Sequence, residues 1–247
     1  MSTNLWIKYR TPSPQACLRL FCLPYAGGGA SIFRSWSDTL SPMVDVVPIQ
    51  LPGREERLKE DPFKDLLSLA DVLAEVLKPY LDIPFAVFGH SMGALIGYEL
   101  VQRIKQKYKK EPKQLIVSAF PPPHTIKKGS AINQLPDFEL IEKLKELNGI
   151  PNEILNSPEA ISLFASILRA DISMVETYIY NPNEKLSCPI FVFGGTGDKE
   201  ILTEQLRLWK EYTSGNFKLQ LFSGDHFFLN SLRANVLAAI SQYLLDL

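Results

Sequence analysis

Cysteine and histidine are both scarce in this sequence, with three residues of each among 247. Cys17, Cys22 and Cys188 are an odd, widely spaced set, which is not the pattern of a disulfide framework. None of them has a Cys or His neighbour at the spacing of zinc ligands. We interpret them as small buried or half-buried thiols, and the sequence implies neither a metal nor an organic cofactor.

Long apolar runs and a strong charge of one sign are also missing. No run is long enough to cross a bilayer, and residues 1–13 lack an apolar core followed by a small-residue cleavage site. We therefore expect a cytoplasmic protein with no membrane partner. The formal net charge of −1 gives no indication of a nucleic-acid or membrane-surface binder. No exposed apolar helix stands out, so we expect a monomer.

The composition, with 46% hydrophobic and 21% charged residues, allows a sizeable core, and the length suits one α/β domain over 1–247. Short apolar, β-branched and aromatic runs alternate with longer helical patterns, which is typical of a mostly parallel, twisted sheet flanked by helices. The predicted strands are Leu18–Leu23, Val44–Gln50, Phe85–Phe88, Gln114–Ala119, Ile190–Phe193 and Lys218–Phe222. The predicted helices are Ile32–Leu40, Lys64–Tyr80, Met92–Lys109, Thr203–Tyr212 and Leu229–Leu245.

One stretch, about 121–183, breaks this alternation because it has helical patterns but no good strand. It opens with three consecutive prolines and closes near Asn181-Pro182, both of which stop helices. Its helical patterns cover Phe138–Leu147 and Glu159–Tyr180. We expect a helical lid inserted between two strands, the alternative being ordinary crossover helices.

The strongest local signal is Gly89-His90-Ser91-Met92-Gly93, which follows a predicted strand and precedes a predicted helix. This is the setting of the nucleophile elbow of α/β-hydrolases. The turn is so tight that side chains two positions from the serine would clash, and glycine relieves the clash. We therefore predict that Ser91 is a nucleophile and that the N–H of Met92, at the start of a helix, faces a developing oxyanion.

A serine hydroxyl needs a base, and three histidines are available. His90 adjoins the serine and points elsewhere in such a turn, and His124 falls in the predicted lid. His226 follows the last predicted strand, so its loop comes over the serine. We predict that His226 is the base and that the other two histidines are structural.

The acid that orients this base should lie between the serine and the base in the chain. Asp198 leaves a predicted strand through Gly194-Gly195-Thr196-Gly197, a loop free to aim a carboxylate at the imidazole. Asp225 is the competitor, but it is an immediate neighbour of the base and is badly placed to bond it. We predict Asp198.

A second oxyanion donor should come from the loop after an early strand. Pro24-Tyr25-Ala26-Gly27-Gly28-Gly29 follows the first predicted strand, and we nominate the Ala26 N–H. A phosphate-binding interpretation fails because neither Gly-Lys-Ser/Thr nor Gly-x-Gly-x-x-Gly spacing is present. The residues alone thus predict a serine acyl hydrolase that works through an acyl-serine intermediate.

Several segments, in order, resemble the type II thioesterases associated with nonribosomal peptide and polyketide synthases, over roughly residues 18 to 245. The elbow is common to many hydrolases, whereas the Pro-Gly-Arg and Leu-Arg-Ala-Asp segments are more specific. The segments are Leu23–Gly28, Leu51–Arg57, Phe88–Ala94, Gly149–Leu155, Leu168–Asp171, Phe193–Asp198 and Gly224–Leu229.

This resemblance implies a substrate: an acyl, aminoacyl or peptidyl thioester on the phosphopantetheine arm of an acyl or peptidyl carrier protein. The role would be to clear stalled or misprimed carriers in antibiotic-type biosynthesis. The alternatives are a medium-chain fatty-acyl carrier-protein thioesterase, a general serine esterase or lipase, an enzyme that transfers the acyl group to an alcohol instead of water, and a non-catalytic binding module. The chain departs from the family at Phe120-Pro121-Pro122-Pro123, where a glycine–arginine segment is frequent.

Three further features have two interpretations each. Leu163, Phe164, Ile167 and Leu168 either line an acyl tunnel or pack within the lid. Lys105, Lys107, Lys109 and Lys110 are either a docking patch for an acidic carrier protein or a solvated helix end. We expect Arg54 and Arg57 to order the loop over the site, and Asp171 to pair with Arg169 or with another lid residue.

Overall fold

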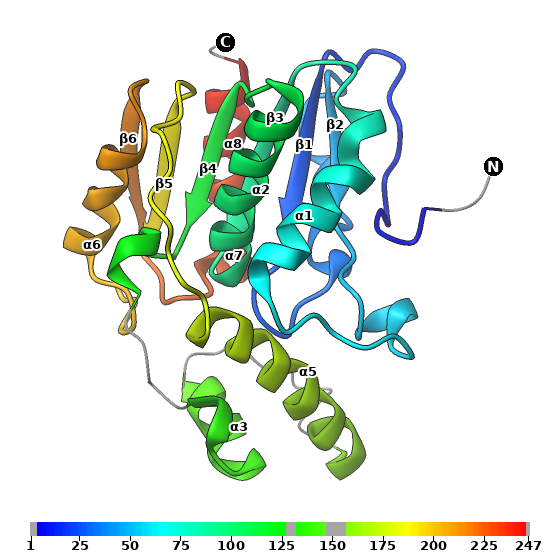
Figure 1. The fold of residues 1–247 in the computed structure, drawn as a ribbon, viewed down its shortest axis with the longest axis vertical. Coiled ribbons are helices and arrows are strands. Elements are labelled where there is room, and N and C mark those ends of the chain that lie inside the picture. Colours follow the sequence, from blue (N-terminus) through cyan, green and yellow to red (C-terminus); the bar gives the residue numbers. More distant parts are fainter. Residues whose placement is uncertain (1–3, 127–131, 147–156, 246–247) are drawn as a thin grey trace.

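The computed structural model describes residues 4–126, 132–146 and 157–245 (Figure 1). These residues form a six-stranded parallel sheet in the order β2-β1-β3-β4-β5-β6. All six strands were predicted, β1 with the same ends and each of the others with one end shifted by one or two residues. The strands are β1 (Leu18–Leu23), β2 (Val44–Pro48), β3 (Phe85–His90), β4 (Gln114–Ser118), β5 (Ile190–Gly195) and β6 (Phe217–Phe222).

The strand order reverses between β1 and β3, because the chain goes from β1 to β2 on one side and then returns to β3 on the other. In open parallel sheets, ligands bind at such a switch point, in the crevice outside the carboxyl ends of the strands. Every residue of β3 is buried, as expected for a central strand with helices on both faces.

Helices cover both faces of the sheet (Figure 1). One apolar core lies under α1 (Leu66–Leu77) and α2 (Met92–Tyr108), and a second lies under α8 (Arg233–Leu245). The predicted helix over 229–245 is divided at Leu232 into α7 (Phe228–Ser231) and α8. The segment 203–212, predicted as one helix, forms the α-helix α6 (Thr203–Arg207) followed by the 3₁₀ helix η7 (Leu208–Tyr212).

The predicted α-helix Ile32–Leu40 is wrong. The segment forms two 3₁₀ turns, η1 (Ala30–Phe33) and η2 (Trp36–Asp38). In 3₁₀ geometry, residues i and i+3 lie on the same side, which directs Phe33 and Trp36 together onto the sheet. Both side chains are buried, and their ring centroids are 4.8 Å apart.

Between β4 and β5, the described residues form helices and turns: η5 (Pro123–Thr125), η6 (Ile132–Gln134), α3 (Asp137–Glu146) and α5 (Pro158–Glu176). Helix α5 crosses the carboxyl end of the sheet, and α3 packs on its outer side (Figure 1). The segment Gly149–Leu155, one of the family-like signatures, lies outside the described residues. In the described parts of the chain, no helix combines the length and apolarity that spanning a membrane requires.

Candidate active site

Ser91 lies in the sharp turn between β3 and α2, with a backbone φ of +53° that non-glycine residues rarely adopt. The turn is fixed by the Ser91 N–H, which donates to the Ser118 carbonyl at 2.8 Å. A Cβ on Gly93 would lie 2.6 Å from the Pro24 carbonyl oxygen and would overlap the Leu23 carbonyl. Glycine is therefore needed where the turn meets the loop after β1.

The predicted serine, base and acid lie in one hydrogen-bonded chain. The Ser91 Oγ is 3.0 Å from His226 Nε2, and His226 Nδ1 is 2.8 Å from Asp198 Oδ2. The Asp198 side chain is 1% exposed and that of His226 is 8% exposed. Because a carboxylate only accepts, Nδ1 carries the proton, which leaves Nε2 free to accept the proton of the serine.

The other oxygen of Asp198 fixes the orientation of this carboxylate. Asp198 Oδ1 accepts the N–H groups of Glu200 and Ile201 at 2.9 and 3.1 Å. Asp225, the competitor, accepts the N–H of Phe227 at 2.9 Å instead. The glycine-rich exit of β5 is held against the next loop by the Gly197 N–H, which donates to the Gly224 carbonyl at 2.8 Å.

The other two histidines make structural contacts. His90 Nε2 donates to the backbone carbonyl of His226 at 3.0 Å, and its Nδ1 is 2.8 Å from the Ser118 hydroxyl. Burial, with the nearby His226, holds the pKa of His90 well below its usual range, so it stays neutral. His124 stacks on Tyr212, whose hydroxyl is 2.8 Å from His124 Nδ1.

The two nominated oxyanion donors lie beside the serine. Ala26 belongs to the loop after β1, and Met92 is the first residue of α2, so its N–H has no acceptor within the helix. Both residues line the same cavity as Ser91 and His226. The loops after β1 and β3 thus meet at the point where the strand order reverses. The first loop supplies the backbone N–H of Ala26, and the second supplies the Ser91 nucleophile and the backbone N–H of Met92.

The cavity at Ser91 has a volume of about 250 Å³ and is mostly apolar. Phe120, Leu168 and Val175 form part of its wall, and Lys143, Glu176 and Glu200 supply its charged groups. Among the described residues, no group of three or more His, Cys, Asp or Glu side chains is placed to hold a metal ion. The arrangement matches that of a serine acyl hydrolase with a small acyl pocket.

Comparison with known proteins agrees with this chemistry. A family model, described as the thioesterase domain, matches residues 18–244. The chain belongs to the thioesterase family. It is 42% identical over 226 residues to the gramicidin S biosynthesis protein GrsT of Aneurinibacillus migulanus, which covers 92% of this chain and 88% of that protein.

Two solved structures are similar over nearly their full lengths. The type II thioesterase BorB from the borrelidin biosynthetic cluster has a TM-score of 0.90 and 36% identity, covering 99% of both chains. The RedJ thioesterase from the prodiginine pathway of Streptomyces coelicolor has a TM-score of 0.89 and 36% identity, covering 94% of this chain and 93% of that one. The predicted α/β-hydrolase fold, hydrolase activity and resemblance to type II thioesterases are confirmed.

Sequence reasoning missed Phe120 as a wall of this thioesterase's pocket. Phe120 follows Ala119, whose φ of +52° is left-handed, and the Trp209 indole N–H donates to the Phe120 carbonyl at 2.8 Å. The sequence did single out Phe120-Pro121-Pro122-Pro123 as a departure from the family's glycine–arginine pattern, but the departure did not indicate which residue lines the pocket. The Phe120 side chain is 9% exposed and makes this side of the pocket apolar.

Of the four lid residues considered, only Leu168 serves both of the proposed roles. Leu168 lines the cavity and also packs against α3, and Phe164 packs within the same apolar cluster. Leu163 is 45% exposed and does neither.

The expectation for Asp171 is wrong. Its partner is Arg54 in the loop before α1, at 2.6 Å, whereas Arg169 pairs with Asp137 of α3. Arg54 does contact the loop after β1, since its Nη1 donates to the Gly28 carbonyl at 3.3 Å. Sequence spacing carried no signal for a pair 117 residues apart.

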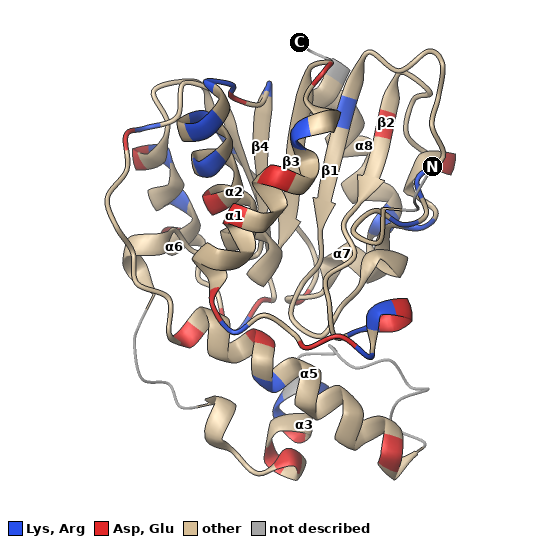
Figure 2. Ribbon diagram, turned by 45° about the vertical axis from the view of Figure 1, so that its right-hand side comes forward, with Lys and Arg blue, Asp and Glu red and all other residues tan. Residues whose placement is uncertain are grey.

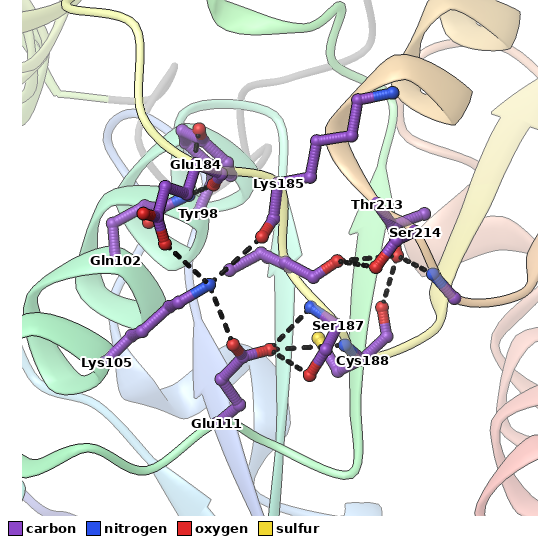
Figure 3. A network of polar contacts seen from close by, with 12 residues as sticks. Tyr98, Gln102, Lys105, Glu111, Glu184, Lys185, Ser187, Cys188, Thr213 and Ser214 are labelled. Carbon is purple, nitrogen blue, oxygen red and sulfur yellow. Dashed lines mark hydrogen bonds and ion pairs between the residues drawn. The ribbon is translucent and has the colours of Figure 1, made fainter.

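The lysines near the end of α2 are far from the pocket, and two of them, Lys105 and Lys107, pair with acidic side chains. Lys105 Nζ lies 2.9 Å from Glu111 and donates to the Lys185 carbonyl at 3.0 Å (Figure 3). Lys107 pairs with acidic residues of α1, Asp71 and Glu75. At 1.5 Å per residue, α2 places Lys105 about 20 Å from its first turn. These basic residues and the helices α3 and α5 lie at opposite ends of the molecule (Figure 2), which does not favour a docking patch at the site.

Proposed function

We propose that this thioesterase hydrolyses acyl and aminoacyl thioesters carried on the phosphopantetheine arm of acyl or peptidyl carrier proteins. In this role it clears stalled or misprimed synthases. The observation that carries the proposal is the Ser91–His226–Asp198 hydrogen-bond chain, which opens into a small apolar cavity. Similarity to GrsT and BorB supports the choice of a synthase-bound thioester over a simple ester.

The reaction proceeds in two halves. Ser91 Oγ attacks the thioester carbonyl while His226 Nε2 takes its proton, and the Ala26 and Met92 N–H groups stabilise the oxyanion. The tetrahedral intermediate expels the thiolate of the arm, which receives the proton from His226. Water then attacks the carbonyl of the acyl-serine as His226 accepts one of its protons. The second tetrahedral intermediate collapses, the bond to Ser91 Oγ breaks, His226 returns the proton to Oγ, and the free acid leaves. Asp198 keeps the imidazole in the required tautomer throughout.

The size of the cavity limits the length of the acyl group that the enzyme can accept. Its volume of about 250 Å³ lies just below the usual range for ligand pockets, about 300–1,000 Å³. A short acyl or aminoacyl group fits such a space better than a long peptidyl chain. This selectivity suits an enzyme that removes misprimed starter groups and spares the growing product.

The three cysteines of the chain are all free thiols, which supports a reducing compartment such as the cytoplasm. We also propose that the enzyme acts there as a monomer on carrier proteins, with no cofactor of its own.

The decisive assay offers one set of acyl groups in two forms. The groups are loaded on a phosphopantetheinylated carrier protein or supplied as small-molecule esters, with the Ser91→Ala protein as the blank. We expect a strong preference for the carrier thioester that depends on Ser91. Equal or better turnover of the simple esters would instead indicate a general serine esterase, and turnover by the blank would refute the mechanism.

A further inference from the structure

A buried ion pair joins helix α5 to the loop between β2 and α1. The Arg54 side chain is 3% exposed and that of Asp171 is fully buried. Arg54 Nη1 donates to Asp171 Oδ2 at 2.6 Å and Nη2 donates to Oδ1 at 2.8 Å, which is the two-pronged geometry of a strong pair. Desolvation offsets much of the attraction in a buried pair, so stability alone does not account for it.

The same carboxylate also holds the loop that follows β1. Asp171 Oδ2 accepts the N–H of Gly27 at 2.8 Å. Gly27 follows Ala26, the proposed oxyanion donor, and has a left-handed φ of +78°. Arg54 Nη1 donates to the carbonyl of the next residue, Gly28, at 3.3 Å. The ion pair therefore holds two successive residues, Gly27 and Gly28, immediately after the oxyanion donor.

Packing places α5 directly against this loop. A Cβ on Gly27 would lie 2.9 Å from the far edge of the Phe164 ring of α5, so this ring packs directly on the loop at the glycine. On the far side of the loop, the Ala30 N–H donates to the buried Gln50 side chain at 3.0 Å. The loop is thus held between α5 and the segment after β2.

We propose that Asp171 is a positioning residue that sets the oxyanion hole, so that α5 must be docked on the loop for the hole to exist. The inference rests on the acyl-transfer mechanism proposed above. An oxyanion donor is effective only when it is already aimed at the position of the developing charge. Arg54 neutralises the carboxylate, which keeps its charge from opposing the oxyanion. Displacement of α5 would withdraw Asp171 from Gly27 and switch off catalysis.

A matched pair of double variants separates positioning from stability. Arg54→Met with Asp171→Asn removes both buried charges but keeps a side-chain oxygen that can accept from Gly27. Arg54→Met with Asp171→Leu removes the charges and the acceptor, with a side chain of nearly the same size. Replacing a buried ion pair by apolar groups of similar volume is often tolerated. If leucine at 171 prevents folding, Arg54→Met with Asp171→Ala takes its place.

Turnover of a small acyl thioester is measured, together with the Kd of an alkyl boronic acid that forms a tetrahedral anion on Ser91. We expect kcat of the leucine variant to be at least tenfold below that of the asparagine variant. KM should change less than threefold, because the oxyanion hole acts in the transition state. The boronate Kd should rise by the same factor as kcat falls.

Asp137→Asn is the control, because it breaks the exposed Arg169–Asp137 pair on the outer side of α5. Its kcat should stay within twofold of the parent protein. The proposal is overturned if the leucine and asparagine variants agree within twofold in kcat and in boronate Kd. The small substrate needs no carrier protein, and boronate binding needs no turnover, so failure of the carrier assay would count against the proposed function alone.

Discussion

Replacement of Asp198 by asparagine tests the orientation of the base. Both oxygens of Asp198 are engaged: Oδ2 with His226, and Oδ1 with the N–H groups of Glu200 and Ile201. In the asparagine variant, the amide oxygen must remain with the two N–H groups, so its NH₂ faces His226. The imidazole then has to accept at Nδ1 and carry its proton on Nε2, where it cannot take the proton of the serine.

The structure sets a lower limit on the effect. Turning the amide to restore the correct tautomer would break the hydrogen bonds of the exposed Glu200 N–H and the half-buried Ile201 N–H, at about 0.5–1.5 kcal/mol each. At least about 1 kcal/mol thus favours the wrong tautomer, which alone lowers kcat by about fivefold. In Ser-His-Asp triads the same substitution costs about 10⁴ in kcat, or about 5 kcal/mol. We expect a loss between these limits.

The assay compares Asp198→Asn with Asp225→Asn on one acyl thioester, by release of the free thiol at saturating substrate. Asp225 Oδ1 accepts the Phe227 N–H, and asparagine keeps that acceptor, so the second variant should stay within threefold of the parent. Circular dichroism confirms that both variants are folded. A loss of less than fivefold for Asp198→Asn, or a larger loss for Asp225→Asn, would refute the assignment of the acid.

Three other predictions concern the stability and the selectivity of the fold. Burial raises the pKa of Glu99 above its ordinary value of 4.5, so the folded protein favours the neutral acid. This preference stabilises the folded state at low pH, and the stabilisation is lost as the pH rises through the pKa of the folded state. The Tyr178 hydroxyl donates to Glu99 at 2.6 Å, and Glu99→Gln keeps a side-chain acceptor for it. This variant should raise Tm at pH 8 but not at pH 4. Equal changes in Tm at both pH values would contradict the prediction. Phe120→Ala enlarges the pocket and should raise kcat/KM for longer or branched acyl groups relative to acetyl, whereas an unchanged ranking in a competition assay would show that Phe120 does not limit the acyl group. Gly93→Ala places a Cβ 2.6 Å from the Pro24 carbonyl oxygen, which is too close for a normal contact. The free energy of unfolding, measured by urea titration, should fall by about 1–3 kcal/mol. An unchanged urea midpoint would show that the turn can relax around the added methyl group.

Local patterns were sufficient for the sheet and for the turn at the nucleophile. The strands are continuous apolar runs, and burial on both faces imposes that pattern on the sequence itself. Gly89 and Gly93 flank Ser91 because the tight turn excludes side chains at both positions. The steric requirement of the turn can therefore be recognised directly from the two glycines in the sequence. The short 3₁₀ turns at 30–38 were mistaken for a helix because periodicity alone does not separate i+3 from i+4 contacts.

The sequence by itself therefore determined the parallel sheet, the position of Ser91 and the order of the three residues now found in one hydrogen-bonded chain. Only the tertiary structure decided which charged residues meet. Arg54 and Asp171, for example, are 117 residues apart. The pocket wall at Phe120 is likewise formed by elements that are distant in the chain. Such contacts depend on how loops and helices converge at the end of the sheet, and no local spacing encodes that convergence.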